Sequence, residues 1–425
     1  MAAVAEAQAG DKLVLADGTY EIGYLNGGHI LNKEGLVITA AEGAKPVVLY
    51  TDAGAYLKVE ASTTFEGITF DGGEDKPSFL ITTYGVAVEE IVVYNCEFKN
   101  YNYFAISDEW SKGCHVGSLK IESSLFHDGG SVVRFSAAGL NNENPCDYFE
   151  LKNSTIYNID ITSQYVSIVD VPSLSTSDVE NEFIVNHCTF YNCIVKSTDY
   201  AAISTYTLNY HVSNTIFAYA TETADQRAIH NMFLSAEVNN CLTFNYIKDD
   251  GGFRGGTIMT NCLMNTDPMF THAEHGIFCL QEGSPAIGAA TDGTNLGDPR
   301  WNTPHDLVEL SVLNPDHGTV EGAGVYKEGE IVTVVAYAKP DYKFAAWIDN
   351  NYVNEEVTDR IYSFEITGDV NLQAEFEYEE GAQGDATDIE NNIISNSQVM
   401  KVIQNGRLFI IREGKIYNAQ GQVVK

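Results

Sequence analysis

Short apolar runs separated by polar and turn-forming residues recur along the first 264 residues of the chain. One phrase repeats among them: a small polar residue, one or two further residues, then an aromatic, as in YNCEF at 94–98 and SNTIF at 213–217. The eight copies end at intervals of 28, 28, 31, 33, 27, 27 and 20 residues, on Phe70, Phe98, Phe126, Tyr157, Phe190, Phe217, Phe244 and Met264. A repeat of this length is typical of a solenoid.

Each repeat reads as strands and turns, with no helical periodicity between the copies. Coils stacked about 4.8 Å apart would place each aromatic above the previous one and pair their backbones. The pattern therefore predicts an all-β chain that begins with a parallel β-helix, with a core stack of Phe98, Phe126, Phe190 and Phe217. A leucine-rich horseshoe would need a recurrent leucine pattern that this chain lacks.

Two smaller β segments are predicted after the solenoid. Longer alternating strands at 331–337, 361–366 and 370–378 indicate a small β module, preceded by a linker, PHDLVE, at 304–309. Near the C-terminus, two apolar runs flank Asn405-Gly406, a favoured hairpin turn, so a β-meander tail is expected there. The predicted domains are 1–303, 311–379 and 391–425.

The charge of the chain restricts its partners. It carries 24 basic and 59 acidic residues, a net charge of −35, so nucleic acid is not an expected partner. A polyanionic sugar would need a local basic patch or a bridging cation. No apolar run approaches 18 residues, so no membrane span is predicted. The opening MAAVAEAQAG lacks the features of a signal peptide, which leaves a removed signal or a cytoplasmic protein as alternatives.

The eight cysteines fall into different settings. Four of them lie inside the repeated phrase, where we expect reduced, packed thiols: Cys96, Cys188, Cys241 and Cys262. Cys114 and Cys146 lie in loops of successive coils and could pair, although connectivity does not follow from sequence. No CxxC pair or Cys/His cluster has zinc spacing, so no metal site is predicted from the cysteines.

Loop insertions gather on three consecutive coils, at 107–118, 136–148 and 171–182. They start at similar distances from the aligned aromatic, so they would build a wall beside a sheet face, where solenoids commonly bind ligands. Tolerated surface insertions are the alternative. Trp110, in the first loop, is a candidate for substrate binding.

Basic side chains fall at similar phases along the solenoid. Arg227 and Arg254 each follow their aligned aromatic by 10 residues, and Arg134 follows its aromatic by 8. We predict a substrate-binding set of Arg134, Arg227, Arg254, Trp110 and His230. The catalytic residues are unknown, and the candidates are Lys196, Arg227 and Arg254, because β-elimination needs a base and a cation beside the uronic carboxylate. The alternative is a solvated charge ladder with Asp199 and Asp225 as counterions.

The opening phrase GDKLVLADGTYEI at 10–22 resembles that of pectin-lyase-like β-helices, particularly polysaccharide lyase family 6, the chondroitinase B and alginate lyase group. This resemblance implies that the parallel β-helix is right-handed and that the protein is carbohydrate-active. It also implies catalysis by a Lys and an Arg on neighbouring coils, and calcium as a cofactor held by acidic and Asn side chains. No acidic cluster around Lys196 matches that calcium site, so no catalytic residue is carried over.

Three later segments also resemble known proteins. Within residues 265–301, a DPxF phrase followed by GSPAIGA resembles the last coil and cap of many secreted β-helix proteins. The closing GDPRW resembles β-helix domains of Bacteroidetes polysaccharide-utilisation proteins, and Asp267 and Asp298 are expected turn residues. Residues 313–380, with GTVEGAGVYKEGEIVTVVA and the run from Pro340 to Trp347, resemble internalin B-type repeat modules, which implies a spacer with Trp347 in its core. The ending RLFIIREGKIYNAQGQVVK resembles type IX secretion sorting domains, which implies export to the cell surface.

Together these features predict an extracellular or cell-surface β-helix protein that binds an acidic, uronate-containing polysaccharide. If it is an enzyme, the resemblance implies a β-eliminating lyase. A non-catalytic glycan-binding or adhesion protein that uses the same face is the alternative.

Overall fold

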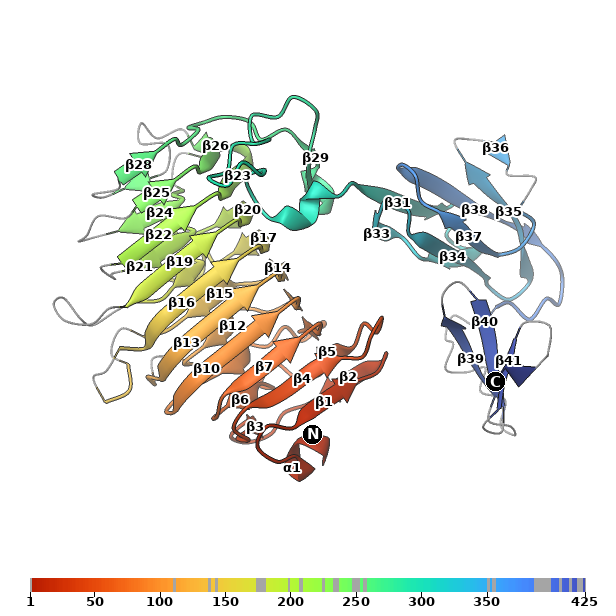
Figure 1. Ribbon diagram of the computed structural model, residues 1–425. Coiled ribbons are helices and arrows are strands. Elements are labelled where there is room, and N and C mark those ends of the chain that lie inside the picture. The colour runs from red at the N-terminus through yellow and green to blue at the C-terminus, as the bar shows by residue number, and fades with distance from the viewer. Residues whose placement is uncertain are drawn as a thin grey trace. The chain divides into compact units, whose positions relative to one another are not determined.

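The computed structural model describes residues 2–109, 112–136, 139–141, 144–172, 181–197, 199–205, 209–223, 226–231, 237–246, 253–254, 258–349, 352–353, 357–385, 399–404, 407–412, 415–418 and 423–424. The chain divides into two compact units, 1–302 and 303–425. Strands dominate both units (Figure 1), and the α-helix among the described residues is α1 (Ala2–Glu6).

Three parallel sheets form most of the first unit, a right-handed β-helix in which the chain visits each sheet once per coil. The first sheet contains β1 (Lys12–Leu15), β4 (Leu36–Ala40), β7 (Thr63–Glu66), β10 (Ala87–Tyr94), β13 (His115–Glu122), β16 (Cys146–Lys152), β19 (Glu182–Asn186), β22 (Asn209–Ser213), β25 (Glu237–Asn239) and β28 (Ile258–Thr260). The second contains β2 (Thr19–Ile22), β5 (Val47–Tyr50), β8 (Thr69–Asp71), β11 (Glu97–Lys99), β14 (Leu125–His127), β17 (Thr155–Asp160), β20 (Thr189–Ile194), β23 (Ile216–Thr223) and β26 (Leu242–Tyr246).

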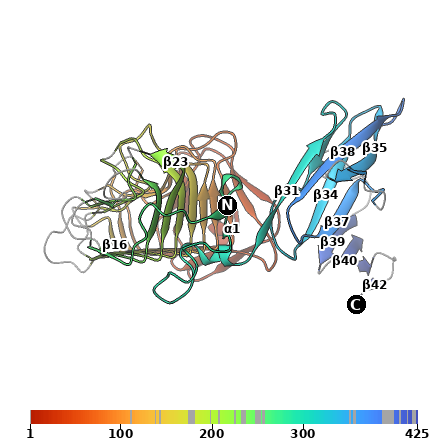
Figure 2. The same ribbon diagram turned by 90° about the horizontal axis from the view of Figure 1, so that it is seen from above.

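The third sheet contains β3 (His29–Leu31), β6 (Leu57–Val59), β9 (Phe79–Thr82), β12 (Phe104–Ser107), β15 (Ser131–Arg134), β18 (Val169–Asp170), β21 (Ile203–Thr205), β24 (Ile229–Asn231) and β27 (Phe253–Arg254). Figure 2 views this unit from above, and the successive coils overlap along the stack. The predicted solenoid and its all-β class are confirmed.

Aromatic side chains stack along the core as the repeat predicts. The rings of Phe98 and Phe126 lie 4.7 Å apart, those of Phe190 and Phe217 lie 5.0 Å apart, and all four side chains are buried. In two copies of the phrase, the residue in the core stack is the one before the predicted aromatic. Ile156 occupies the core position beside Phe126, and Thr243 occupies the one beside Phe217, so Tyr157 and Phe244 point to the other face of the second sheet.

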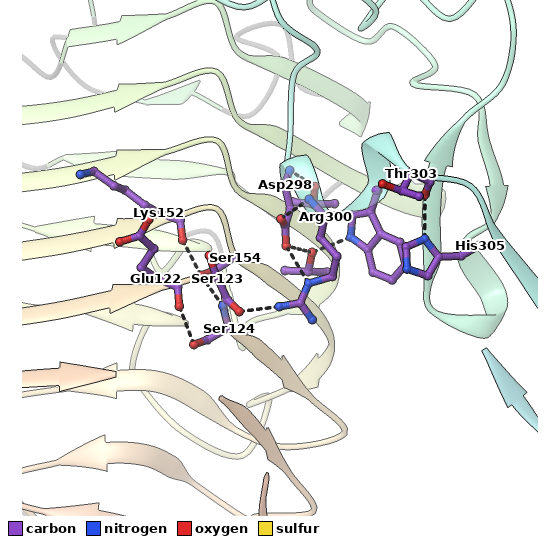
Figure 3. Close-up of polar contacts among 12 residues, drawn as sticks. Glu122, Ser123, Ser124, Lys152, Ser154, Asp298, Arg300, Thr303 and His305 are labelled. Atoms are coloured by element: carbon purple, nitrogen blue, oxygen red, sulfur yellow. Dashed lines mark hydrogen bonds and ion pairs between the residues drawn. The ribbon is translucent and has the colours of Figure 1, made fainter. Parts of the chain in front are cut away.

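Residues 265–302, here called the strap, differ from the predicted last coil and cap. The strap contains β29 (Phe270–His272), the 3₁₀ turns η1 (Ala273–His275) and η2 (Pro299–Asn302), and β30 (Ile277–Leu280). It runs back along the solenoid and forms hydrogen bonds with successive coils through Asn240, Asn214, Thr189, Thr155 and Ser123. Figure 3 shows the contact in which the Arg300 side chain donates to the Ser123 carbonyl beside Asp298.

The strap follows this course because polar corner side chains offer it partners. Asn240 Nδ2 donates to Ala289 O over 2.8 Å, and Asn214 Oδ1 accepts from Thr291 N over 2.8 Å. The apolar side chains Ile258 and Met259 in the last strand of the first sheet stay 55% and 47% exposed. Among the described residues, β28 pairs with β25 on one side, and no strand pairs with its other side.

The second unit begins with a five-stranded sheet of β31 (His305–Val312), β33 (Gly324–Lys327), β35 (Tyr342–Asp349), β36 (Tyr352–Val353) and β38 (Val370–Tyr378). A three-stranded sheet of β32 (Gly318–Glu321), β34 (Ile331–Ala338) and β37 (Ile361–Glu365) accompanies it. Trp347 is fully buried in the shared core, as predicted. The expected linker at 304–309 instead lies mostly in β31, whose backbone pairs with β33 and β38.

The tail forms an antiparallel meander of β39 (Val399–Gln404), β40 (Arg407–Arg412), β41 (Lys415–Asn418) and β42 (Val423–Val424), as predicted. Its expected turn at Asn405-Gly406 lies outside the described residues. Across the described part of the chain, no helix has the length and apolar character needed to cross a membrane.

Candidate functional site

One line of residues across the third sheet brings several predicted site residues into register. It consists of adjacent cross-strand partners, here called the polar row: Lys58, Thr82, Ser107, Arg134, Asp170, Ser204, His230 and Arg254. Each row member follows a core residue such as Val133 or Ile229, so strand alternation directs the row away from the core. Four of its members are nevertheless buried: Thr82, Ser107, Ser204 and His230. Three of the predicted substrate-binding residues, Arg134, His230 and Arg254, therefore share one row.

Arg134 is held by a buried carboxylate at the middle of the row. Its guanidinium lies 3.2 Å from Asp108, which is fully buried. The second carboxylate oxygen of Asp108 accepts hydrogen bonds from the backbone N–H groups of Gly113 and Ser136 and from the Ser136 hydroxyl. Asp108 therefore orients Arg134 and ties together the loops of two coils.

Asp170 stands next to Arg134 in the row, on the neighbouring strand. Burial raises the pKa of Asp170 to about 6, although the Arg134 guanidinium and the Ser167 backbone N–H act in the opposite direction. A carboxyl group with a pKa near neutrality exchanges protons readily, which is the property required of a general acid or base. The middle of the row thus pairs a positive group with a carboxyl group that can hold or release a proton.

Two tyrosines and a lysine border Asp170 in the loops that precede β18 and β21. Tyr165 is 68% exposed, and its ring meets that of Tyr200 edge to face at 6.2 Å. The Lys196 ammonium lies 3.5 Å from the centre of the Tyr165 ring. Burial raises the pKa of Tyr200, and the carboxylates of Asp199 and Asp170 raise it further. We call Tyr165, Lys196 and Tyr200 the tyrosine ledge.

Arg227 and Arg254 do not share a phase, which differs from the prediction. Arg254 pairs with His230, whereas Arg227 precedes β24, is 9% exposed, and accepts a hydrogen bond from Ala202 N through its carbonyl. The cause is an irregularity in β23: Ala218 pairs with Phe244 but Thr223 pairs with Tyr246. The extra residues in β23 shift every later position of that coil, so counting from the aromatic misaligns the two arginines.

The other predicted site residues have different surroundings. Lys196 is exposed at the tyrosine ledge, and His230 is buried within the polar row. Trp110 lies outside the described residues, as does the side chain of Arg254. In the part of the chain that the structure describes, no three His, Cys, Asp or Glu side chains converge as a metal site, so no residue is assigned to calcium.

A second polar cluster lies on the outer face of the second sheet. His127 contacts Glu97 through Nε2 at 2.9 Å and Asp128 through Nδ1 at 2.7 Å, and its ring stacks on Tyr157 at 4.7 Å. Lys99 lies 3.5 Å from Glu97.

Each charge in this cluster stabilises its neighbours. Burial opposes the charge on Glu97, yet His127 and Lys99 lower the pKa of Glu97 to about 2. Burial also opposes the charge on His127, but its two carboxylate partners raise the pKa of the imidazole. Since the charged groups satisfy one another, we interpret this cluster as a stabilising network and not as the binding site.

The distance from the aligned aromatic of each repeat, which places the predicted site residues, does not identify the two tyrosines of the candidate site. Tyr165 and Tyr200 each stand a few residues before a short strand of the third sheet, in successive coils. A recurring tyrosine at that place was the available signal. The cluster around His127 had a clearer signal in the sequence. Lys99, His127 and Tyr157 each follow the core position of their coil by one residue, and they are aligned neighbours in the second sheet.

Two segments of the chain match family models. Residues 183–301 match a domain of unknown function, DUF5123, which spans the later coils and the strap. Residues 308–380 match the divergent InlB B-repeat domain, in agreement with the resemblance found in the sequence. No curated protein matches the chain.

Four chains of known structure match. One is described as the structure of the PL6 family alginate lyase AlyGC, with 17% sequence identity and a TM-score of 0.41. The match covers 61% of this chain and 35% of the lyase, so this chain spans about a third of the lyase's length.

Proposed function

We propose that the solenoid binds an acidic, uronate-containing polysaccharide at the tyrosine ledge and the adjoining middle of the polar row. The observation that carries this proposal is the exposed Tyr165 ring beside Tyr200, with the Lys196 ammonium 3.5 Å from the centre of the Tyr165 ring. Tyrosine offers a flat apolar face for the C–H groups of a sugar ring and a hydroxyl for its polar edge. An ammonium group at the same place can bind a uronate carboxylate through a charge-assisted hydrogen bond.

The surrounding charges make the ledge selective. The chain as a whole is strongly acidic, so long-range electrostatics disfavour a polyanion. Lys196 provides positive charge at the ledge, whereas Arg134 is paired with the buried Asp108. Asp170, beside Arg134, can accept hydrogen bonds from sugar hydroxyls. The proposed ligand is thus held by short-range contacts, and its affinity should fall as salt screens the ammonium group.

The setting proposed for this function is extracellular or at the cell surface. The divergent InlB B-repeat domain at 308–380 and the resemblance of the tail to sorting domains support outer-surface attachment. In that arrangement the solenoid would bind the polysaccharide and the C-terminal segments would retain it at the cell.

A second candidate function is β-elimination at the same place. It is favoured by Asp170, whose pKa is raised to about 6 by burial, next to the Arg134 guanidinium. Asp170 would accept the proton beside the uronate carboxylate, and a neighbouring cation would neutralise that carboxylate. Lys196 is the predicted catalytic candidate that lies at the ledge.

Binding is tested by calorimetry with oligosaccharides from a panel of uronate polysaccharides, with and without calcium. Tyr165→Ala and Tyr200→Ala should each raise Kd by about tenfold or more. Tyr94→Ala is the matched control, because Tyr94 is 43% exposed on the first sheet, away from the ledge. Equal Kd values for all three variants and the native chain would refute the ledge as the binding site.

The same panel separates binding from cleavage. An increase in ultraviolet absorbance from an unsaturated product would establish β-elimination, and Asp170→Asn should then abolish the increase while the oligosaccharide still binds. Binding without any absorbance change in the native chain would leave a non-catalytic glycan-binding protein.

A further inference from the structure

A column of small hydroxyl and thiol side chains lies just after the corner between the first and second sheets. Its backbone N–H groups donate to side chains of the next coil: Cys96 to Ser124 Oγ, Ser124 to Ser154 Oγ, and Cys188 to Thr215 Oγ1. Figure 3 shows the part of this column at Ser124 and Ser154. Ser124 and Ser154 lie between Cys96 and Cys188, and Thr215 lies on the other side of Cys188, so the column keeps these two cysteines away from other thiols.

The last two coils break this rule, because both place cysteine in the column. Leu263 pairs with Leu242, and Leu263 N donates to Cys241 O over 2.8 Å, which puts Cys262 directly beside Cys241. The two thiols are close enough for each to shift the pKa of the other. Adjacent parallel strands lie about 4.8 Å apart, within the range of about 4.4–6.8 Å that separates Cα atoms across a disulfide. The backbone is therefore already placed for a bond between the sulfurs.

The two thiols differ in reactivity. Cys241 is fully buried, and burial raises its pKa. Cys262 is partly exposed, and the Cys241 thiol together with nearby backbone N–H groups lowers its pKa to about 7. The thiolate is the attacking species in disulfide exchange, so Cys262 is the sulfur that meets an oxidant first.

We propose that Cys241 and Cys262 form a reversible disulfide by exchange with a small disulfide such as oxidised glutathione. The Cys262 thiolate attacks one sulfur of the oxidant, forms a mixed disulfide and releases one thiolate. Cys241 loses its proton, attacks the Cys262 sulfur and releases the second thiolate. In total, two protein thiols lose two protons and two electrons, and the small disulfide becomes two thiols.

The bond would fasten the exposed end of the solenoid. Strand β28 pairs with β25 on one side, and its side chains Ile258 and Met259 are exposed. An edge strand of this kind has few bonds to hold it. A disulfide from Cys262 to the buried Cys241 would fix the last coil covalently to the preceding one.

The test starts from the reduced full chain, incubated with oxidised glutathione and then alkylated. Trypsin cleaves after Lys248 and Arg254, so a disulfide joins two separate peptides. The Cys262 peptide also contains Cys279, and fragment-ion sequencing distinguishes the two sulfurs. We expect the Cys241–Cys262 link as the main product, and glutathione attached to Cys262 in Cys241→Ser.

Cys188→Ser is the matched control, since Cys188 occupies the same column without a neighbouring thiol; the link should form in it as in the native chain. Oxidation should also raise the Tm of the native chain by about 5 °C, whereas the Tm of Cys262→Ser should not change on oxidation. The proposal is overturned if the native chain keeps both thiols free, or if it stops at the glutathione adduct of Cys262.

Discussion

At the scale of single residues, one backbone requirement explains the small polar member of the repeated phrase. Asn95, Asn153, Asn214 and Asn240 have φ angles of 52°, 48°, 54° and 52° at the corner between the first and second sheets. Asparagine enters this left-handed region more readily than most residues, because its short polar side chain can form local hydrogen bonds. The phrase therefore combines a residue that turns the chain with an aromatic that fills the core.

The His127 network leads to a prediction about pH. The pKa of His127 is raised, so its contribution to stability is complete below about 6.5 and is lost as pH rises through the higher folded-state pKa. The pKa of Glu97 is lowered from 4.5 to about 2, so its contribution is present above 4.5 and is lost as pH falls toward 2. Both contributions are available between pH 4.5 and about 6.5.

We expect His127→Gln to lower the free energy of unfolding by about 2 kcal/mol at pH 5.5 and by clearly less at pH 9. Urea denaturation at the two pH values measures the difference. His211→Gln is the control, because its pair with Glu237 is about half exposed and should contribute little at either pH. A loss that is the same at both pH values would mean that the charge of His127 has no role.

At the scale of elements, one hydroxyl makes two of the hydrogen bonds that hold the end of the strap. Thr155 Oγ1 accepts a hydrogen bond from Trp301 Nε1 over 2.8 Å and donates one to Asp298 Oδ2 over 2.8 Å. All three side chains are buried, and burial raises the pKa of Asp298 to about 6. Thr155 thus couples β17 to the end of the strap.

Thr155→Val should therefore destabilise the first unit by about 2–4 kcal/mol, because it leaves two buried polar groups without this partner. Thr155→Ser keeps the hydroxyl and should recover most of the loss. Thermal unfolding gives the magnitude, and hydrogen exchange over 296–301 shows whether the strap itself has loosened. If the valine and serine variants behave alike, the hydroxyl does not hold the strap.

At the scale of the whole molecule, the second unit should fold by itself only when it includes β31. That strand pairs with β38 in parallel and with β33 antiparallel, so it lies inside the five-stranded sheet. We predict that a fragment of residues 303–385 unfolds cooperatively, whereas a fragment of residues 313–380 does not. The shorter fragment lacks β31, so it exposes the edges of β33 and β38 and part of the core. Circular dichroism during urea titration compares the two. Cooperative unfolding of 313–380 would show that β31 is dispensable.

Local pattern was enough to predict the solenoid, its core stack and the two later β segments. Alternation of apolar and polar residues, and a recurring aromatic, are short-range properties that each coil carries in its own sequence. The pattern became ambiguous where two neighbouring residues both suited the core. The pattern predicts Tyr157 and Phe244 in the core, whereas the preceding residues, Ile156 and Thr243, occupy it. The stack selects the side chain that fits beside Phe126 or Phe217.

The candidate site, in contrast, depends on how many residues each corner and bulge contains. The irregular pairing of β23 with β26 places His230, and not Arg227, beside Arg254. Counting along the chain cannot reveal this, because register is decided by backbone pairing between coils about 30 residues apart. The same holds for the tyrosine ledge and for the neighbouring thiols of Cys241 and Cys262. The sequence by itself determined the repeat and most of the residues that face the core. Only the tertiary structure decided which of two adjacent candidates filled a core position and which polar residues of different coils became neighbours.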